Sequence, residues 1–234
     1  MSDYVVFSLV APIGAFGGPA GHERRGSEAW PGRGAILGLL GAALGVRRDE
    51  ADALAALGRW KMAVSALSHG PALRDFHTVQ TVPAARIKRP RTRAHATAAL
   101  THRDNAMITR RDYRMDCAFG IALWDGPDPD ALVTALANPV FTPYLGRKSC
   151  PLSAPMGPLR VNAENPLHAL EQVKIPPFLD VDPRQPVFVA SDEPLENDGY
   201  SELHWDVPID REKWHFAARQ VHVARPGPGG EGGA

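Results

Sequence analysis

Apolar runs with two different periods alternate along this chain, and this alternation limits most strongly the folds that it can adopt. The β-branched run YVVFSLVA at Tyr4–Ala11 predicts a buried strand that ends before Pro12. The run AILGLLGAALG at Ala35–Gly45 has apolar residues at helical spacing, and Gly45 stands where a C-terminal cap belongs. The chain therefore begins with a strand followed by a helix that packs on a sheet.

The later runs continue this alternation. We expect short helices in DEADALAALG (49–58) and DPDALVTALA (128–137), the latter with Asp128 as N-cap and Pro129 at its first position. Further strands are expected at Lys61–Ser68, Asp75–Val82, Tyr113–Trp124, 186–191 and 214–224. The order strand, helix, strand, strand, helix, strand predicts an α+β, ferredoxin-like (RNA-recognition-type) core with extra C-terminal strands. We expect one domain at 1–223 and a disordered tail at 224–234.

Composition sets the broad class of protein. Hydrophobic residues make up 44% of the 234 residues and charged residues 22%, which predicts a folded core. Apolar runs all fall short of a membrane span, and the N-terminus lacks a basic leader, so we expect a cytoplasmic protein without a membrane contact. The two cysteines do not form a C-x-x-C motif, which makes a disulfide framework improbable.

A net charge of zero conceals a basic segment in the middle of the chain. Residues 86–114 contain nine Lys or Arg and two Asp or Glu, whereas residues 115–234 contain nine and seventeen. Arg86–Arg111 has few large apolar residues and no sustained period, so we expect an extended arm or a long hairpin. Arginine dominates, which suits bidentate phosphate contacts and stacking on bases. The segment predicts a nucleic-acid contact in preference to a solvated, salt-bridged hairpin.

The sequence lacks the common catalytic signatures. It has no P-loop, no G-x-S-x-G elbow and no Cys/His cluster with zinc spacing, and GRGAILG (32–38) has one residue too many for G-x-G-x-x-G. We therefore predict no catalytic residue, no metal and no cofactor. His77 is interpreted as a strand histidine in preference to a general base, and Cys150 as a packed thiol in preference to a nucleophile. For Tyr113, a base-stacking ring, a catalytic phenol and a core-edge tyrosine all stay open.

Four motifs, in matching order, together resemble one known family. They are the run at Glu23–Glu50, RDFHTVQ (74–80), RRDYRMDCAFGIAL (110–123) and YLGRKSCPL (144–152). Over residues 4 to 223 the chain resembles the CasD family, the guide-RNA 5′-handle-binding subunit of the subtype I-E CRISPR Cascade complex. The resemblance implies a modified ferredoxin-like core with a protruding thumb, here at about 84–111. It also implies a non-catalytic role, because a separate subunit cuts the precursor RNA.

The resemblance further implies partners and RNA-binding residues. The expected partners are the guide (CRISPR) RNA, the Cascade backbone subunit and large subunit and, indirectly, target DNA. The YLGRKSCPL motif is expected to order the loop that packs under the first helix, with Arg147 and Lys148 facing either RNA or a neighbouring subunit. The expected RNA-binding residues are Arg24, Arg25, Arg33, Arg86, Lys88, Arg91, Arg93, Arg110, Arg111, Tyr113, Arg147 and Lys148.

Two alternative functions remain open at this point. In another CRISPR subtype the related subunit is a metal-independent endoribonuclease, and Tyr113, Lys148 and His77 are the residues that would carry that chemistry here. A general RNA-binding module with a basic arm, outside CRISPR systems, is the third possibility, and the four motifs make it the least favoured.

Overall fold

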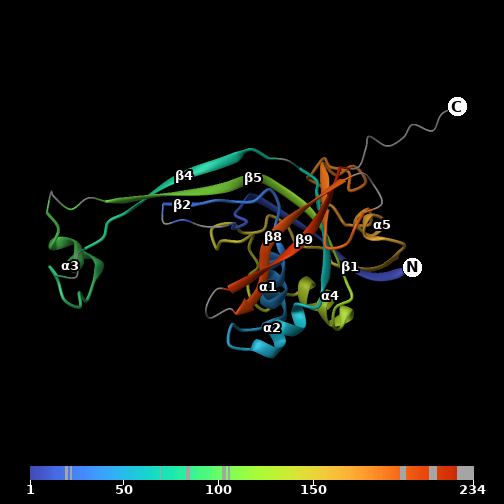
Figure 1. Cartoon of the computed structure of the whole chain (residues 1–234), viewed down its shortest axis with the longest axis horizontal. Helices are drawn as coiled ribbons and strands as arrows, with labels where there is room; N and C mark the ends of the chain where they lie inside the picture. Colours follow the sequence, from blue (N-terminus) through green and yellow to red (C-terminus); the bar gives the residue numbers. More distant parts are fainter. Residues whose placement is uncertain are drawn as a thin grey trace.

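A body with one long projecting arm makes up the computed structural model of this chain (Figure 1). The structure describes residues 1–18, 21, 23–68, 70–82, 85–101, 104, 106–195, 199–210 and 215–225. Nearly all of the expected tail at 224–234 therefore lies outside the described residues. Within the described part, no helix is both long enough and apolar enough to cross a bilayer.

A large antiparallel sheet forms the body. Its strands run in the order β6-β1-β5-β3-β7-β9-β8, and each neighbouring pair is antiparallel. Their bounds are β1 Ser2–Gly14, β3 Lys61–Ala66, β5 Met107–Trp124, β6 Leu159–Ala163, β7 Phe188–Ser191, β8 Gly199–Asp210 and β9 His215–Ala224. The longest pairing joins β1 to β5, from Val5↔Leu123 to Gly14↔Arg114. The fold thus combines helices with a large antiparallel sheet, which agrees with the predicted mixture of helices and strands.

Helices α1 (Arg33–Leu44) and α4 (Pro129–Ala137) cover one face of the sheet, and α2 (Ala51–Leu57) contacts α1. Both predicted helix ends are confirmed. Gly45 adopts a left-handed conformation with φ 77°, and its N–H caps α1. Asp128 accepts a hydrogen bond from the Ala131 N–H at 3.0 Å at the start of α4.

The opposite face of the sheet is covered as well. Helix α5 (Pro166–Leu170) and the residues after it pack there, and Val6, Ala122 and Leu170 belong to this second apolar cluster. Burial on both faces explains why β1 reads as a continuous apolar run. Helix α5 and the residues after it therefore cover part of the sheet face opposite α1 and α4.

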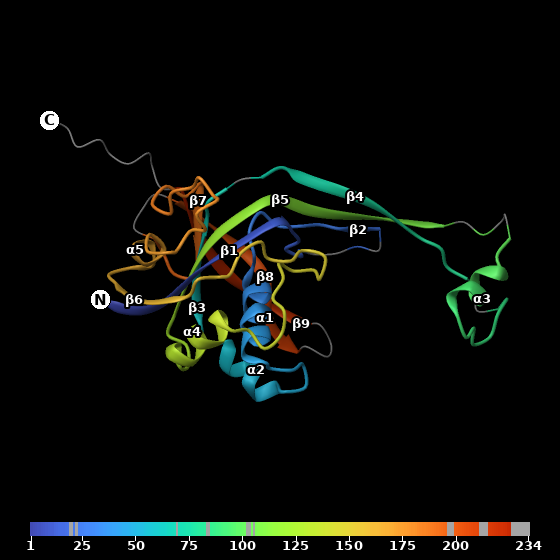
Figure 2. The ribbon, with the colours of Figure 1, turned by 180° about the vertical axis from the view of Figure 1, so that it is seen from behind.

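The arm is a hairpin that continues the body's sheet outwards. Strand β4 (Ala72–Val79) pairs with the first half of β5, from Ala72↔Arg114 to Val79↔Met107. The two-residue strand β2 (Arg24–Arg25) lies on the other side of β5, and α3 (Arg93–Ala98) sits at the far end (Figures 1 and 2). The projecting hairpin thus starts at β4, earlier than the expected thumb boundary at residue 84.

Candidate nucleic-acid interface

Strand alternation gives the arm two distinct side-chain faces, because neighbouring residues of a strand point to opposite sides. The pairing of β2 and β4 with β5 determines which residues share a face. The first face carries Arg24, Arg74, Phe76, Ile108, Arg110 and Asp112. The second face carries Arg25, Asp75, His77, Thr109, Arg111 and Tyr113.

A clamped carboxylate organises the base of the first face. Asp112 accepts from Arg74 Nε at 2.9 Å and from Arg24 NH2 at 2.6 Å. Hydrogen bonds from Arg74 and Arg24 lower the pKa of Asp112 to about 2, so this carboxyl stays ionised at neutral pH. The side chains of Arg24 and Arg74 nevertheless remain 58% and 46% exposed. Asp112 therefore fixes both guanidiniums while leaving their outer edges accessible.

An exposed aromatic ring lies beside these arginines. Phe76 is 66% exposed and pairs across the strands with Arg110, whose side chain is also exposed. Ile108, 57% exposed, continues the same face towards the tip. An aromatic ring among guanidiniums is the arrangement that proteins use to stack unpaired bases while neutralising phosphates. Sequence reasoning missed Phe76, because only the β4–β5 register places it opposite Arg110.

On the second face, the Arg147 guanidinium lies over the ring of Tyr113, 4.6 Å from its centroid. Tyr113 is only 8% exposed and belongs to the main apolar core. Among the described residues, buried side-chain nitrogens without a hydrogen-bond partner include Arg111 Nε, Arg147 NH1 and His77 Nδ1. Buried guanidinium N–H groups without an acceptor are costly, so this face has unused capacity for an anion or another acceptor.

The YLGRKSCPL loop is what positions Arg147. Gly146 has φ +82°, and a Cβ there would stand 1.8 Å from the Ala15 carbonyl oxygen, so only glycine fits. The Leu145 carbonyl accepts from the Ala15 N–H at 3.1 Å, which fastens the loop to the segment just after β1.

The expectation that this motif orders the loop under the first helix stays a prediction. Its backbone hydrogen bond runs to Ala15, in the segment between β1 and α1, and the chain just before the motif contacts the C-terminal end of α1. There the N–H groups of Val140 and Phe141 donate to Ala43 and Ala42, each at 3.0 Å. Lys148, the neighbour of Arg147, is exposed.

Arg33, a predicted RNA contact, is placed away from the arm arginines. Its NH1 donates to Asp192 at 2.8 Å and its backbone N–H to Asp206 at 2.8 Å, and its side chain is 11% exposed. Arg219 joins the same group through Asp206 and Asp192. Arg33 therefore ties the start of α1 to the β8–β9 hairpin, because two carboxylates of the acidic C-terminal half surround it.

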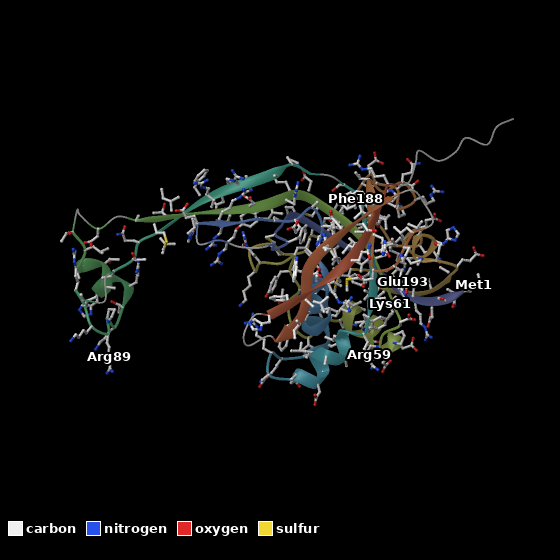
Figure 3. The ribbon with its side chains drawn as sticks, viewed as in Figure 1. Met1, Arg59, Lys61, Arg89, Phe188 and Glu193 are labelled. Atoms are coloured by element: carbon white, nitrogen blue, oxygen red, sulfur yellow. The ribbon has the colours of Figure 1, made fainter. Side chains whose placement is uncertain are left out.

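The remaining predicted cations surround α3 at the far end of the arm. Arg86 forms an ion pair with Asp104, and Arg93 donates to the Gln80 carbonyl. Lys88 and Arg91 are exposed, and Figure 3 shows the nearby Arg89 at the extremity of the arm, remote from the labelled body residues. Arg103, counted in the basic segment, lies outside the described residues. The tip thus combines arginines that are bound to the fold with exposed ones.

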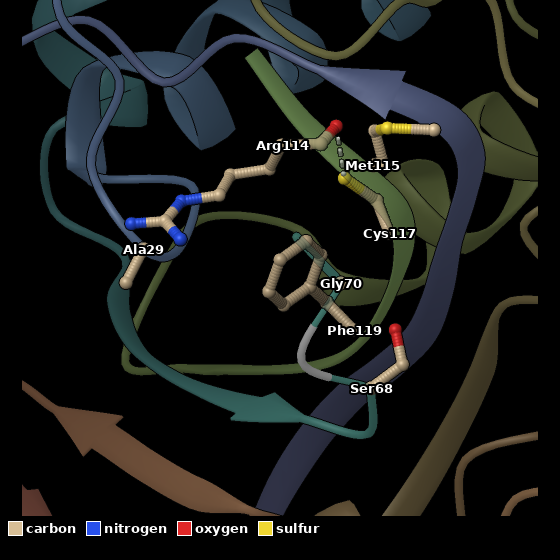
Figure 4. Close-up of a pocket in the computed structure, with 7 residues that line it drawn as sticks. All are labelled: Ala29, Ser68, Gly70, Arg114, Met115, Cys117 and Phe119. Atoms are coloured by element: carbon tan, nitrogen blue, oxygen red, sulfur yellow. Dashed lines mark hydrogen bonds between the residues drawn. The ribbon is translucent and has the colours of Figure 1, made fainter. Parts of the chain in front are cut away.

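Two cavities among the described residues differ in size. The larger, about 300 Å³, is lined by Tyr4, Trp124 and Glu193 among others. The cavity at the base of the arm measures ≈ 10 Å³, room for at most one water, and lies between Arg114, Cys117 and Phe119 (Figure 4). Burial raises the pKa of Cys117 to about 12, which keeps this thiol protonated. Cys150 is fully buried, as a packed thiol should be. Groups of three or more His, Cys, Asp or Glu able to hold a metal do not occur within the described ranges.

Comparison with known proteins identifies the family. The family model described as "CRISPR-associated protein (Cas_Cas5)" matches residues 4–222. The chain is 32% identical, over 97% of its length and 98% of the relative, to "CRISPR system Cascade subunit CasD" of Escherichia coli (strain K12).

Solved structures agree with this result. A chain of a "CRISPR RNA-guided surveillance complex" superposes with a TM-score of 0.67 at 26% identity, covering 94% of this chain and 89% of that chain. A structure described as "Crystal structure of Cas protein" shares the fold, with a TM-score of 0.58 at 23% identity over 94% and 93% of the two chains. The resemblance to CasD is confirmed, and the chain belongs to the Cas5 family of CRISPR-associated proteins.

Proposed function

We propose that this protein is a non-catalytic subunit of a CRISPR Cascade ribonucleoprotein that binds the 5′ handle of the guide RNA through its arm. The proposal is supported by the relative named CasD and by the similar chain in an RNA-guided surveillance complex. In this role the protein works in the cytoplasm and anchors the backbone and large subunits, and it contacts target DNA only indirectly.

One observation carries the proposal: exposed arginines and an exposed phenylalanine share a face of a hairpin that projects from the body. Arg24, Arg74 and Arg110 hold positive charge there, and Phe76 offers a ring directly across from Arg110. Guanidiniums bind phosphates, and an aromatic face stacks on a splayed base. A single-stranded RNA end supplies both groups, whereas the paired bases of a duplex are unavailable for stacking.

We also propose that the body contains a ferredoxin-like core. In chain order, β1, α1, β3, β5, α4 and β6 give the β-α-β-β-α-β pattern. These four strands are adjacent in the sheet, in the order β6-β1-β5-β3, and α1 contacts α4. In this view β7, β8 and β9 extend the core, and the arm is an elongation of the β3–β5 connection.

A binding assay tests the proposal directly. The purified chain is titrated with the 5′ handle of its own guide RNA, labelled with a fluorophore, and with a single strand of the same composition in scrambled order. Binding of the handle at least about tenfold tighter, which corresponds to about 1.4 kcal/mol, is expected. Equal affinities would contradict handle recognition and favour the general RNA-binding module.

An endoribonuclease is the second candidate, because His77 and Tyr113 share the second face and Lys148 lies in the loop that covers Tyr113. The low exposure of Tyr113 beneath Arg147 argues against a catalytic phenol. Incubation of the protein with its repeat RNA in EDTA is expected to leave the RNA intact. A 2′,3′-cyclic phosphate product that disappears in Tyr113→Phe would overturn the non-catalytic assignment.

A further inference from the structure

The larger cavity lies in the body, on the side away from the arm. Its volume of about 300 Å³ is within the range of small-molecule sites. Its walls come from the start of β1, the end of β5, the start of α5 and the residues after β7. Figure 3 shows Glu193 of this wall near Lys61 in the body, whereas Arg89 marks the extremity of the arm. The cavity is therefore separate from the surface that we assign to RNA.

Aromatic and aliphatic groups line part of this cavity. The ring centroids of Tyr4 and Trp124 lie 5.6 Å apart, and both residues are only 4% exposed. Leu167 and Leu195, both partly buried, line the cavity as well. Aromatic rings favour a neighbouring organic cation, and aliphatic side chains pack against the methylene groups of an alkyl chain. These walls suit an alkylammonium ligand better than a hydrated metal ion.

The charged side chains that line the cavity are acidic. Asp125, Glu164 and Glu193 belong to the wall, and the described lining residues include no Lys or Arg. Burial and the charge of Glu193 raise the pKa of Tyr4, as expected in an electronegative site. Glu164 lies 3.7 Å from the His168 ring, a partner that is charged only when protonated. A cationic ligand would therefore gain more from this cavity than a neutral or an anionic one.

Lys61 shows which kind of cation these carboxylates accept. Its Nζ lies 2.8 Å from Asp125 and 2.7 Å from Glu193, and hydrogen bonds to both raise the pKa of Lys61. Two of the three carboxylates thus already hold one alkylammonium group, which the fold itself supplies. Glu164 belongs to a different wall, at the start of α5, and its side chain is 70% exposed.

The spacing of the carboxylates distinguishes between classes of cation. Within the described part of the chain, no three carboxylate, thiol or imidazole groups come close enough to share one metal ion. An elongated ligand with several ammonium groups can instead reach carboxylates on separate walls. The aliphatic stretch between its ammonium groups would meet the leucines that lie among these carboxylates in the cavity lining.

We propose that this cavity binds an aliphatic polyamine, with one ammonium group at Glu164, a second near Glu193, and the methylene chain between them against Leu167 and Leu195. Each wall then meets the chemistry that it favours, since carboxylates pair with ammonium groups and leucines with methylenes. The site is additional to the RNA-binding surface of the arm and does not depend on it.

Calorimetric titration of the purified full-length chain, free of RNA, with spermidine tests the site. Saturable binding of one equivalent is expected, and the backbone amide NMR signals of residues 164–167 and 193–195 should shift during the titration. Magnesium chloride at equal ionic strength is the competing probe and should leave these signals in place. The proposal is wrong if binding does not saturate, if the shifts are scattered over the acidic surface, or if magnesium produces the same shifts.

Charge reversal supplies the quantitative test. Glu164→Lys removes the carboxylate and adds an ammonium group at the same place, so the affinity for spermidine should fall at least about tenfold. Glu171→Lys makes the same change of charge at an exposed position at the other end of α5, outside the cavity lining, and should change the affinity less than about twofold. Equal losses in the two variants would show that overall charge attracts the amine, and would overturn the site.

Discussion

Arginines in the body and in the arm of this protein differ in what surrounds them. In the body, Arg33 and Arg219 are 11% and 15% exposed and share the carboxylate of Asp192. In the arm, Arg110 is exposed, and Arg111 keeps a buried Nε without a partner among the described residues. Arg33 and Arg219 of the body are satisfied by the fold, whereas Arg110 and Arg111 of the arm retain capacity for a ligand.

This contrast shows that carboxylate partners, not the number of arginines, identify a binding surface. Arg33 was expected to bind RNA from the family resemblance, and in the structure two aspartates bind it. Arg24 and Arg74 are intermediate between the buried and the exposed arginines. Each forms an ion pair with Asp112, and each side chain remains about half exposed.

The largest effect is expected from reversing charge in the arm. Arg110→Glu combined with Arg111→Glu should weaken binding of the 5′-handle RNA by about 100-fold at physiological salt, since phosphate contacts are lost and repulsion is added. Fluorescence anisotropy measures this change. Arg47→Glu with Arg48→Glu, an exposed arginine pair in the body, is the matched control and should change affinity little. Equal losses in both variants would mean that overall charge, not the arm, governs binding.

Removing a body arginine should act on stability instead. Arg33→Ala leaves Asp192 and Asp206 with less compensation and is expected to cost about 3 kcal/mol of unfolding free energy in urea titrations. Arg110→Ala, at an exposed position, should cost less than about 0.5 kcal/mol. The prediction is wrong if Arg33→Ala unfolds at the same urea concentration as the unaltered protein while losing RNA affinity.

Phe76 tests whether the arm uses stacking in addition to charge. Phe76→Ala should reduce RNA affinity roughly tenfold, because one base stack contributes about 1–3 kcal/mol. Phe76→Tyr keeps the aromatic face and should restore most of the affinity. Since Phe76 is 66% exposed, neither variant should shift the thermal midpoint of unfolding appreciably. Equal RNA affinities of the alanine and tyrosine variants would show that no base stacks on Phe76.

The smallest effect concerns pH. Hydrogen bonds from Arg74 and Arg24 depress the folded-state pKa of Asp112 to about 2, below its ordinary value of 3.8. Its stabilising contribution is therefore complete above about pH 4 and is lost as pH falls towards 2. Carboxyl-carbon NMR should show a titration midpoint near 2 and no change between pH 5 and 8. A midpoint near 4 would show that the Arg24–Asp112–Arg74 clamp does not form in solution.

Local signals in the sequence predicted much of the fold. Strand β1, helix α1 with its Gly45 cap and helix α4 with its Asp128 cap were all predicted from adjacent residues. Strand β8 was missed, because its inward residues are charged and it contains Pro208, which opposes strand formation. The two-residue strand β2 and the short helices α3 and α5 carry too few residues for any periodic signal.

The candidate site was less predictable, because it depends on partners distant in sequence. The basic segment was predicted from its charge and missing periodicity to be an extended arm or a long hairpin, and helix α3 within it was not predicted. The Arg33 contacts join residues 159 and 173 positions apart, which no local pattern reports. The same applies to Phe76 and Arg110, which only the β4–β5 register brings together.

Ultraviolet cross-linking of the assembled complex, with mass-spectrometric mapping of the peptides attached to guide RNA, tests the central claim most directly. We expect RNA to be attached to peptides within residues 72–82 and 107–114, with Phe76 as the favoured position. The peptide that contains Arg33 should carry no RNA. RNA attached only to peptides of the body, with the arm unmodified in a complex that contains the guide, would contradict it.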